Sequence, residues 1–150
     1  MLNNLESYSN RIARLRDNLG LSIPIKSKEM INALESKLGI KCIAKSTNEL
    51  IMDTKLVRLD NRTEIWYSEN LSECKLVYLL AFELSRLLSL DCNELVISEF
   101  AAMLVMPKDE FIYACKKHIC DGKVDITKVS EDLNVTVQAV NVRGHVLSLW

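Results

Sequence analysis

Glycine and proline are scarce in this sequence, with four Gly and two Pro among 150 residues. This scarcity argues against a disordered chain and against an all-β fold that needs many tight turns. The formal net charge is −1, so no overall electrostatic field favours nucleic acid or an anionic membrane. Hydrophobic residues make up 49% of the chain, enough for a core without disulfides or metals. We therefore expect one domain over residues 1–150.

Long apolar runs are also missing. No stretch approaches eighteen uninterrupted apolar residues, so the sequence predicts no membrane-spanning helix. The beginning, "MLNNLESYSN", is polar and contains no apolar leader, which predicts a cytoplasmic protein. An odd number of cysteines at irregular spacing favours reduced, partly buried thiols over a disulfide framework. These cysteines are Cys42, Cys74, Cys92, Cys115 and Cys120.

Apolar periodicity divides the chain into three regions. Residues 1–39 have apolar residues at three- or four-residue steps, which predicts two amphipathic helices separated near Gly20. We expect Arg11, Arg14 and Arg16 to lie on the solvated face of the first helix. Residues 40–68 are rich in β-branched and aromatic residues and should form a small sheet. Residues 72–150 are again helical in pattern, with a loop near residues 120–125.

The order of helices, a small sheet and more helices predicts an α+β class with a helical majority. "KLVRL" and "TEIWYS" flank the turn sequence "DNR", so these segments should form a hairpin in a small, mostly antiparallel sheet. Ser27 is the expected N-cap of the second helix, and Gly39 is expected to end it. Pro107 should interrupt a helix or open the next one.

The stretch "AFELSRLL", residues 81–88, looks like an altered zinc-peptidase helix. The H-E-x-x-H motif places two histidines on one helical face around one zinc ion, with the glutamate acting as general base. Here Glu83 is in place, but Phe82 and Arg86 occupy the two histidine positions. Phenylalanine has no donor atom, and arginine is always protonated, so zinc binding is not expected at this site.

The following block, "ELVISEFAAMLVMP" at residues 94–107, extends the likeness. Together the two blocks resemble the ImmA/IrrE family of phage- and mobile-element-associated metallopeptidases, whose members have H-E-L-G-H-x-L-L and then E-x-x-A-N-x-F-A-A-x-L-L-M-P. Ile97 and Ser98 replace the family's Ala-Asn pair. "LNVTVQAVNVRGHVL" is similar to the family's closing segment, so the resemblance covers about residues 40–150. The second-block residues kept here are Glu94, Phe100, Ala101, Ala102, Leu104, Met106 and Pro107.

The resemblance implies a compact zincin-like domain in which Glu83 has the position of the general base and Glu94 that of the carboxylate zinc ligand. Active relatives use zinc, but with Phe82 and Arg86 at the histidine positions the resemblance implies a catalytically inactive member without a cofactor. We expect Arg86 to replace the ion electrostatically, since two facing carboxylates without a cation would be unfavourable. Phe82 should fill the vacated volume.

The leading functional hypothesis is a regulatory pseudopeptidase of a phage or mobile-element system. It would bind a protein partner, such as a transcriptional repressor, through the former substrate cleft, where Trp66 and Tyr67 could lie. An active peptidase with unusual ligands, such as Cys92 with Glu83 and Glu94, is one alternative. An ordinary core helix with a surface Glu83–Arg86 pair is the simplest reading of the first block alone.

Two further clusters give weaker hypotheses. Residues 126–147 could form a helix-turn-helix that contacts DNA through Gln138, Asn141 and Arg143, but the basic charge nearby is thin, so we expect no direct nucleic-acid binding. Cys115, His118 and Cys120 could contact a metal only if the helix ends near His118. The simpler interpretation is two half-buried thiols and a histidine at a helix C-terminus.

Overall fold

The computed structural model describes residues 2–89 and 93–150, with side chains from Tyr8 onward. Within these residues the chain forms seven helices and two small sheets, which confirms the predicted α+β class and its helical majority. The helices are α1 (Leu2–Asn18), α2 (Ser27–Leu38), α3 (Glu73–Leu88), α4 (Glu94–Val105), α5 (Lys108–Lys117), α6 (Ile126–Leu133) and α7 (Val137–Val146). The strands are β1 (Lys41–Lys45), β2 (Thr54–Leu59), β3 (Arg62–Ser68), β4 (Ile119–Cys120) and β5 (Lys123–Val124).

The larger sheet has the strand order β1-β3-β2 and is mixed. Strands β2 and β3 form the predicted antiparallel hairpin, with Leu59 paired to Arg62 at the turn. Strand β1 instead pairs in parallel with β3, so the sheet is less antiparallel than predicted. The reason is that the connection between Lys45 and Thr54 crosses the end of β3, which therefore lies between its two neighbours.

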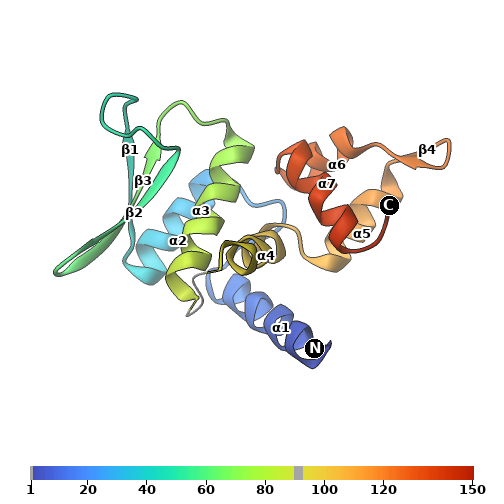
Figure 1. Ribbon diagram of the computed structural model, residues 1–150, viewed down its shortest axis with the longest axis horizontal. Coiled ribbons are helices and arrows are strands. Elements are labelled where there is room, and N and C mark those ends of the chain that lie inside the picture. The colour runs from blue at the N-terminus through green and yellow to red at the C-terminus, as the bar shows by residue number, and fades with distance from the viewer. Residues whose placement is uncertain (1, 90–92) are drawn as a thin grey trace.

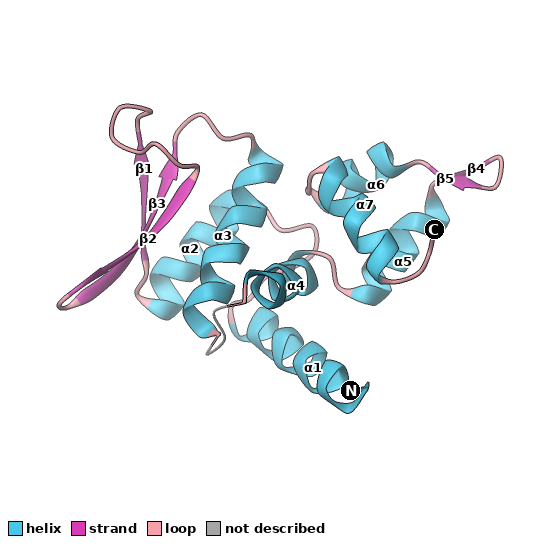
Figure 2. Cartoon of the chain, in the orientation of Figure 1, coloured by secondary structure: helices cyan, strands magenta, loops and turns pink. Residues whose placement is uncertain are grey.

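The sheet lies at one end of the molecule and the α5–α7 helices at the other, with α3 and α4 between them (Figure 1). Figure 2 shows the two small sheets at opposite ends of this helical body. A hydrophobic core runs through both parts, from Ile65 on β3 through Leu80 and Leu84 on α3 to Val129 and Val140 on α6 and α7. The α3 helix is therefore buried on its core face, which fixes the position of the altered motif.

Several predicted helix boundaries agree with the observed ones. Gly39 ends α2 in the left-handed conformation, at φ 65°, as predicted. Pro107 precedes the first residue of α5, where its missing N–H costs no helical hydrogen bond. At another helix boundary, Asn134 ends α6 in the left-handed conformation at φ 53° and forms a tight joint with α7. Ser27 is not the N-cap of α2, since Lys26 takes that position and the helix begins at Ser27.

Glu73, in the first turn of α3, joins three distant parts of the chain. Its carboxylate accepts hydrogen bonds from the backbone N–H of Ser27, at 2.7 Å, and from the Ser27 hydroxyl. The side-chain amide of Asn134 donates to the same carboxylate at 3.3 Å and to the Ile25 carbonyl at 2.8 Å. Burial acts to raise the pKa of Glu73, but these hydrogen bonds outweigh it and hold the pKa below its ordinary value.

Two arginines cap the C-terminal end of α4. Arg16 donates from Nε to the Leu104 carbonyl at 3.0 Å and from Nη2 to the Met103 carbonyl at 2.8 Å. Arg143 on α7 donates to the Met106 carbonyl at 3.2 Å. The prediction that Arg16 lies on a solvated face is therefore wrong, because the last carbonyls of a helix lack helical partners and this side chain donates hydrogen bonds to two of them.

In the described part of the chain, no helix has the length and apolarity that crossing a membrane requires.

Candidate functional site

The altered motif forms a small charged site at the sheet-facing side of α3. Glu83 is buried, with 5% of its side chain exposed. Its Oε1 accepts a hydrogen bond of 2.9 Å from the hydroxyl of Thr54, the first residue of β2. Its Oε2 lies 3.5 Å from Nε of Arg86, one helical turn further along α3. A strand and a helix thus hold the carboxylate from two sides.

Arg86 connects this carboxylate to α4. Its Nη2 lies 4.0 Å from Oε1 of Glu94, the first residue of α4. The guanidinium carbon lies 5.1 Å from the centre of the Phe82 ring, within cation–π range, and Phe82 packs against the hydrophobic core. The Arg86 side chain is 44% exposed and that of Glu94 is 79% exposed. The structure therefore brings together the predicted residues Phe82, Glu83, Arg86 and Glu94.

The Glu83 oxygen nearest Arg86 has an unusual environment. Among the described residues, Oε2 of Glu83 is buried without a hydrogen-bond partner, although Arg86 lies within ion-pair distance. A buried carboxylate oxygen without a hydrogen bond is costly unless a nearby positive charge compensates it. The Arg86 guanidinium is the charge that faces this oxygen, so the contact is electrostatic rather than a directed hydrogen bond.

The residues of this site do not fit zinc. Phe82 offers no lone pair, and a guanidinium cannot be deprotonated to become a ligand. No cluster of three or more metal-binding side chains occurs within residues 2–89 and 93–150. The alternative ligand set with Cys92 includes a residue that lies outside the described residues.

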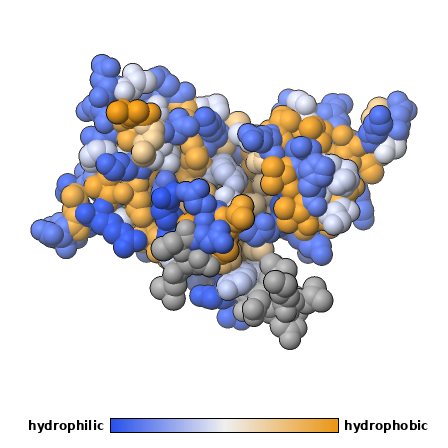
Figure 3. Space-filling view, in the orientation of Figure 1, coloured by the Kyte–Doolittle hydropathy of each residue, from blue (hydrophilic) through white to orange (hydrophobic). Residues whose placement is uncertain are grey.

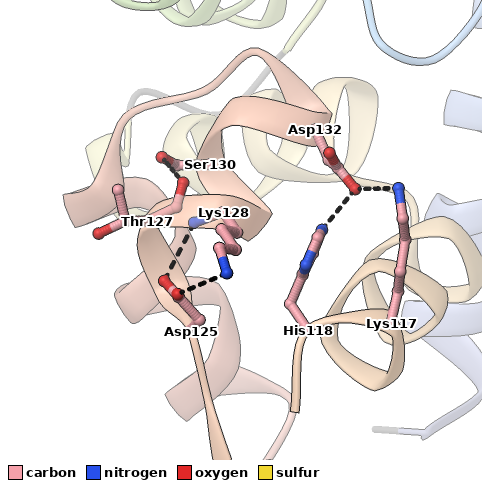
Figure 4. A network of polar contacts seen from close by, with 7 residues as sticks. All are labelled: Lys117, His118, Asp125, Thr127, Lys128, Ser130 and Asp132. Atoms are coloured by element: carbon pink, nitrogen blue, oxygen red, sulfur yellow. Dashed lines mark hydrogen bonds and ion pairs between the residues drawn. The ribbon is translucent and has the colours of Figure 1, made fainter. Parts of the chain in front are cut away.

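The predicted Cys115, His118 and Cys120 cluster does not converge in the described structure. Cys115 is buried in the core, and burial raises the pKa of its thiol, whereas Cys120 is exposed on β4. The His118 ring points instead to Asp132 on α6, with Nε2 2.7 Å from Oδ2 (Figure 4). Lys117 donates to the same oxygen at 2.9 Å, and both contacts lower the pKa of Asp132. This network links α5 to α6 and gives His118 a structural role, because its ring pairs with Asp132 and not with a metal-binding cluster.

One of the three residues named for DNA contact, Arg143, is not exposed to solvent. Arg143 is buried, with 4% of its side chain exposed, and its Nη1 pairs with Glu99 at 3.2 Å. In this structure the Arg143 guanidinium therefore holds α4 and α7 together inside the fold instead of facing solvent. Gln138 and Asn141 are exposed, and Asn141 accepts a hydrogen bond of 3.2 Å from the Trp150 indole.

Trp66 and Tyr67 do not line one cleft together. They are consecutive residues of β3, so their side chains leave opposite faces of the sheet. Tyr67 pairs directly with Thr54, which bonds Glu83, and so lies on the helix-facing side. Trp66 lies on the outer face, where its indole donates to Glu64 at 2.8 Å and Lys45 stands 4.4 Å above its ring.

Thr54 was not expected in the site. A threonine at the beginning of a short strand is ordinary in sequence, and only the packing of β2 against α3 brings its hydroxyl to Glu83.

Comparison with known proteins adds a similarity of fold. No protein-family model matches the chain, and no curated protein matches it. Among solved structures, a Mycobacterium tuberculosis transcriptional regulator superposes with a TM-score of 0.72 at 13% sequence identity. The match covers 92% of this chain and 46% of the regulator, so this chain spans less than half of that protein's length. At this identity the comparison establishes a shared fold.

Proposed function

We propose that this chain is a regulatory protein that has the scaffold of a metallopeptidase, lacks the catalytic chemistry and binds a protein partner. The observation that carries the proposal is the position of Arg86, which stands between the carboxylates of Glu83 and Glu94 at 3.5 and 4.0 Å. A general base in such a peptidase acts on a metal-bound water. With a guanidinium in place of the metal, Glu83 has no activated water to deprotonate.

The regulatory part of the proposal has two supports. The resemblance to ImmA/IrrE proteins implies a partner from a phage or mobile-element circuit, such as a transcriptional repressor. The solved structure with the same fold is named as a transcriptional regulator, which agrees with a role in gene control. We therefore propose that the partner is bound without being cleaved.

Direct DNA binding through α6 and α7 is a second candidate. The tight joint at Asn134 and the name of the regulator with a similar fold favour it. Against it, residues 107–150 contain six basic and six acidic residues, and Arg143 is buried. Binding to duplex DNA that weakens with salt and is reduced by Gln138→Ala would favour this candidate over the protein partner.

The decisive experiment combines metal analysis with a substitution of the former base. Protein purified without chelator should contain much less than one equivalent of zinc, manganese or iron. Complexes purified from the native host through a tag on the chain should contain the same intact partner for wild type and Glu83→Gln. Arg58→Gln, an exposed change on β2, is the control. Stoichiometric metal, or partner cleavage that stops in Glu83→Gln, would mean that the protein is an active enzyme.

A further inference from the structure

A cavity of about 370 Å³ lies between α1, α3 and α4, and we call it the α1 cavity. Helix α1 runs below α4 in Figure 1, and Arg16 fixes its C-terminal end to the last turn of α4. The rings of Tyr8 and Phe100 belong to the lining and contact each other, with centroids 5.0 Å apart and planes tilted by 58°. Sites for small molecules occupy about 300–1,000 Å³ and are lined mainly by apolar and aromatic side chains, so this cavity has the size and character of such a site.

The walls of the α1 cavity are mostly apolar. Leu15 of α1, Leu88 of α3 and Val96 of α4 lie beside the two rings. Ser85 of α3 also lines the cavity, but its hydroxyl donates to the Ala81 carbonyl at 2.8 Å and has no proton left for a ligand. The walls therefore favour a ligand with an apolar body, which gains free energy by leaving water.

Arg11 is the one charged side chain among the described residues of this lining. It lies three residues after Tyr8 and shares its face of α1, on the exposed side of the cavity. No hydrogen bond or ion pair engages Arg11 in the part of the chain whose side chains the structure describes. Arg16, Arg86 and Arg143, by contrast, each contact an oxygen of the chain. The cavity therefore offers one positive charge that the fold does not use.

This charge distinguishes the α1 cavity from another hollow, a groove of about 710 Å³ between α3, α4 and α7. Figure 3 shows the surface hollowed between α3 and α4 on one side and α7 on the other. The charged side chains of that groove already have partners, since Arg143 pairs with Glu99 at 3.2 Å and Lys75 with Asp53 at 3.0 Å. Only the α1 cavity, of these two, selects a ligand by its charge.

The charge and the walls together define the class of ligand. The guanidinium would repel a cation, and a neutral molecule would gain nothing from it. A carboxylate, sulfonate or phosphate group can accept two parallel hydrogen bonds from a guanidinium. A nucleic acid needs several cations along its backbone, and one arginine beside an apolar cavity does not supply them.

We propose that the α1 cavity binds a small amphipathic anion, whose apolar body lies against the two rings and Val96 and whose acidic group pairs with Arg11. Such a ligand contacts the last turn of α3 and the first turn of α4, which are the turns that carry Arg86 and Glu94. The cavity is thus a site at which a small molecule acts beside the altered motif, in addition to the proposed protein partner.

The test compares two fluorescent dyes that differ in one charge. Anilinonaphthalene sulfonate has an apolar body and a sulfonate, and phenylnaphthylamine has the same rings without the charge. The full chain should bind the sulfonate about fivefold or more tighter than the neutral dye. Arg11→Gln should weaken binding of the sulfonate about fivefold and change binding of the neutral dye less than about twofold. Arg14→Gln, at another exposed arginine of α1 that does not line the cavity, is the matched control and should change neither affinity by more than about twofold.

A second pair of variants tests the position of the apolar body. Val96→Phe places a larger side chain in the cavity and should weaken binding of both dyes about fivefold or more. Leu95→Phe, at the exposed neighbouring position on α4, is its control and should change neither affinity by more than about twofold. Circular dichroism checks that all variants are folded.

Four results would each overturn the inference. They are equal affinities of the wild type for the two dyes, equal effects of the two arginine substitutions, unchanged binding to Val96→Phe, and no dye binding tighter than about 1 mM. None of them bears on the absence of peptidase activity, which metal content and Glu83→Gln test separately.

Discussion

Removing the Arg86 charge should destabilise the fold through the buried Glu83 carboxylate. At 3.5 Å, two unit charges interact by about 5 kcal/mol at an effective dielectric constant near 20, which is an upper bound. Arg86 is 44% exposed, so solvent screens part of this attraction and the pair lies between the exposed and the buried classes. Exposed pairs contribute about 0.2–1 kcal/mol, and breaking a buried pair costs about 3–5 kcal/mol. We therefore expect Arg86→Met to lower the free energy of unfolding by about 2 kcal/mol.

A double-mutant cycle isolates the electrostatic part. Glu83→Gln removes the charge and keeps an oxygen that can accept the hydrogen bond from Thr54. In that background, Arg86→Met should cost less than about 0.5 kcal/mol, which gives a coupling of about 1.5 kcal/mol. Urea unfolding followed by circular dichroism measures the free energy of unfolding of all four proteins. In thermal unfolding, the single variant Arg86→Met should have a melting temperature about 4–8 °C below that of wild type.

Arg14→Met, an exposed change on α1, controls for the loss of a surface arginine and should alter stability by less than about 0.5 kcal/mol. A coupling below about 0.3 kcal/mol between positions 83 and 86 would refute the idea that the guanidinium compensates the buried carboxylate.

Three further predictions concern groups outside this site. Arg143→Met should cost about 2–4 kcal/mol in urea unfolding, because it leaves Glu99 and a helix-terminal carbonyl unpaired, and a change below about 0.5 kcal/mol would contradict this. The lowered pKa of Glu73 means that its contribution to stability is present above the unfolded pKa of about 4.3 and is lost as the pH falls through the folded pKa. Wild type should therefore lose more stability than Glu73→Gln between about pH 5 and pH 3, measured by urea unfolding at each pH, and parallel curves would argue against it. Burial, with a smaller effect from the Glu35 carboxylate, raises the pKa of Cys42 to about 12. A thiol reagent at pH 8 should therefore label the exposed Cys120 long before Cys42, and mass spectrometry of peptides measures the two rates.

Local patterns in the sequence were enough to predict most of the elements. Apolar periodicity and the residues at helix ends predicted α2 with its end at Gly39 and α5 after Pro107. The hairpin followed from the turn residues between β2 and β3. The parallel pairing of β1 could not be predicted, because it depends on how the connection from Lys45 crosses the sheet.

The contacts of the side chains were harder to predict from the sequence than the helices and strands were. Spacing along one helix was sufficient to bring Glu83 and Arg86 together, and the short link to the next helix brought Glu94. Arg16 and Arg143 looked like surface residues because nothing local distinguishes an arginine in water from one that reaches a distant helix end. The groove between α3, α4 and α7 is likewise formed by segments that only tertiary packing brings together.

The end of α4 depends on both extremities of the chain. Arg16 comes from the first helix and Arg143 from the last, and each supplies hydrogen bonds to carbonyls that would otherwise be unpaired. Deleting either helix would therefore remove hydrogen bonds from the last turn of α4, far along the chain from the deletion. The α6–α7 pair is for the same reason a poor candidate for excision as an independent module, and any truncation study of this protein should begin from the intact chain.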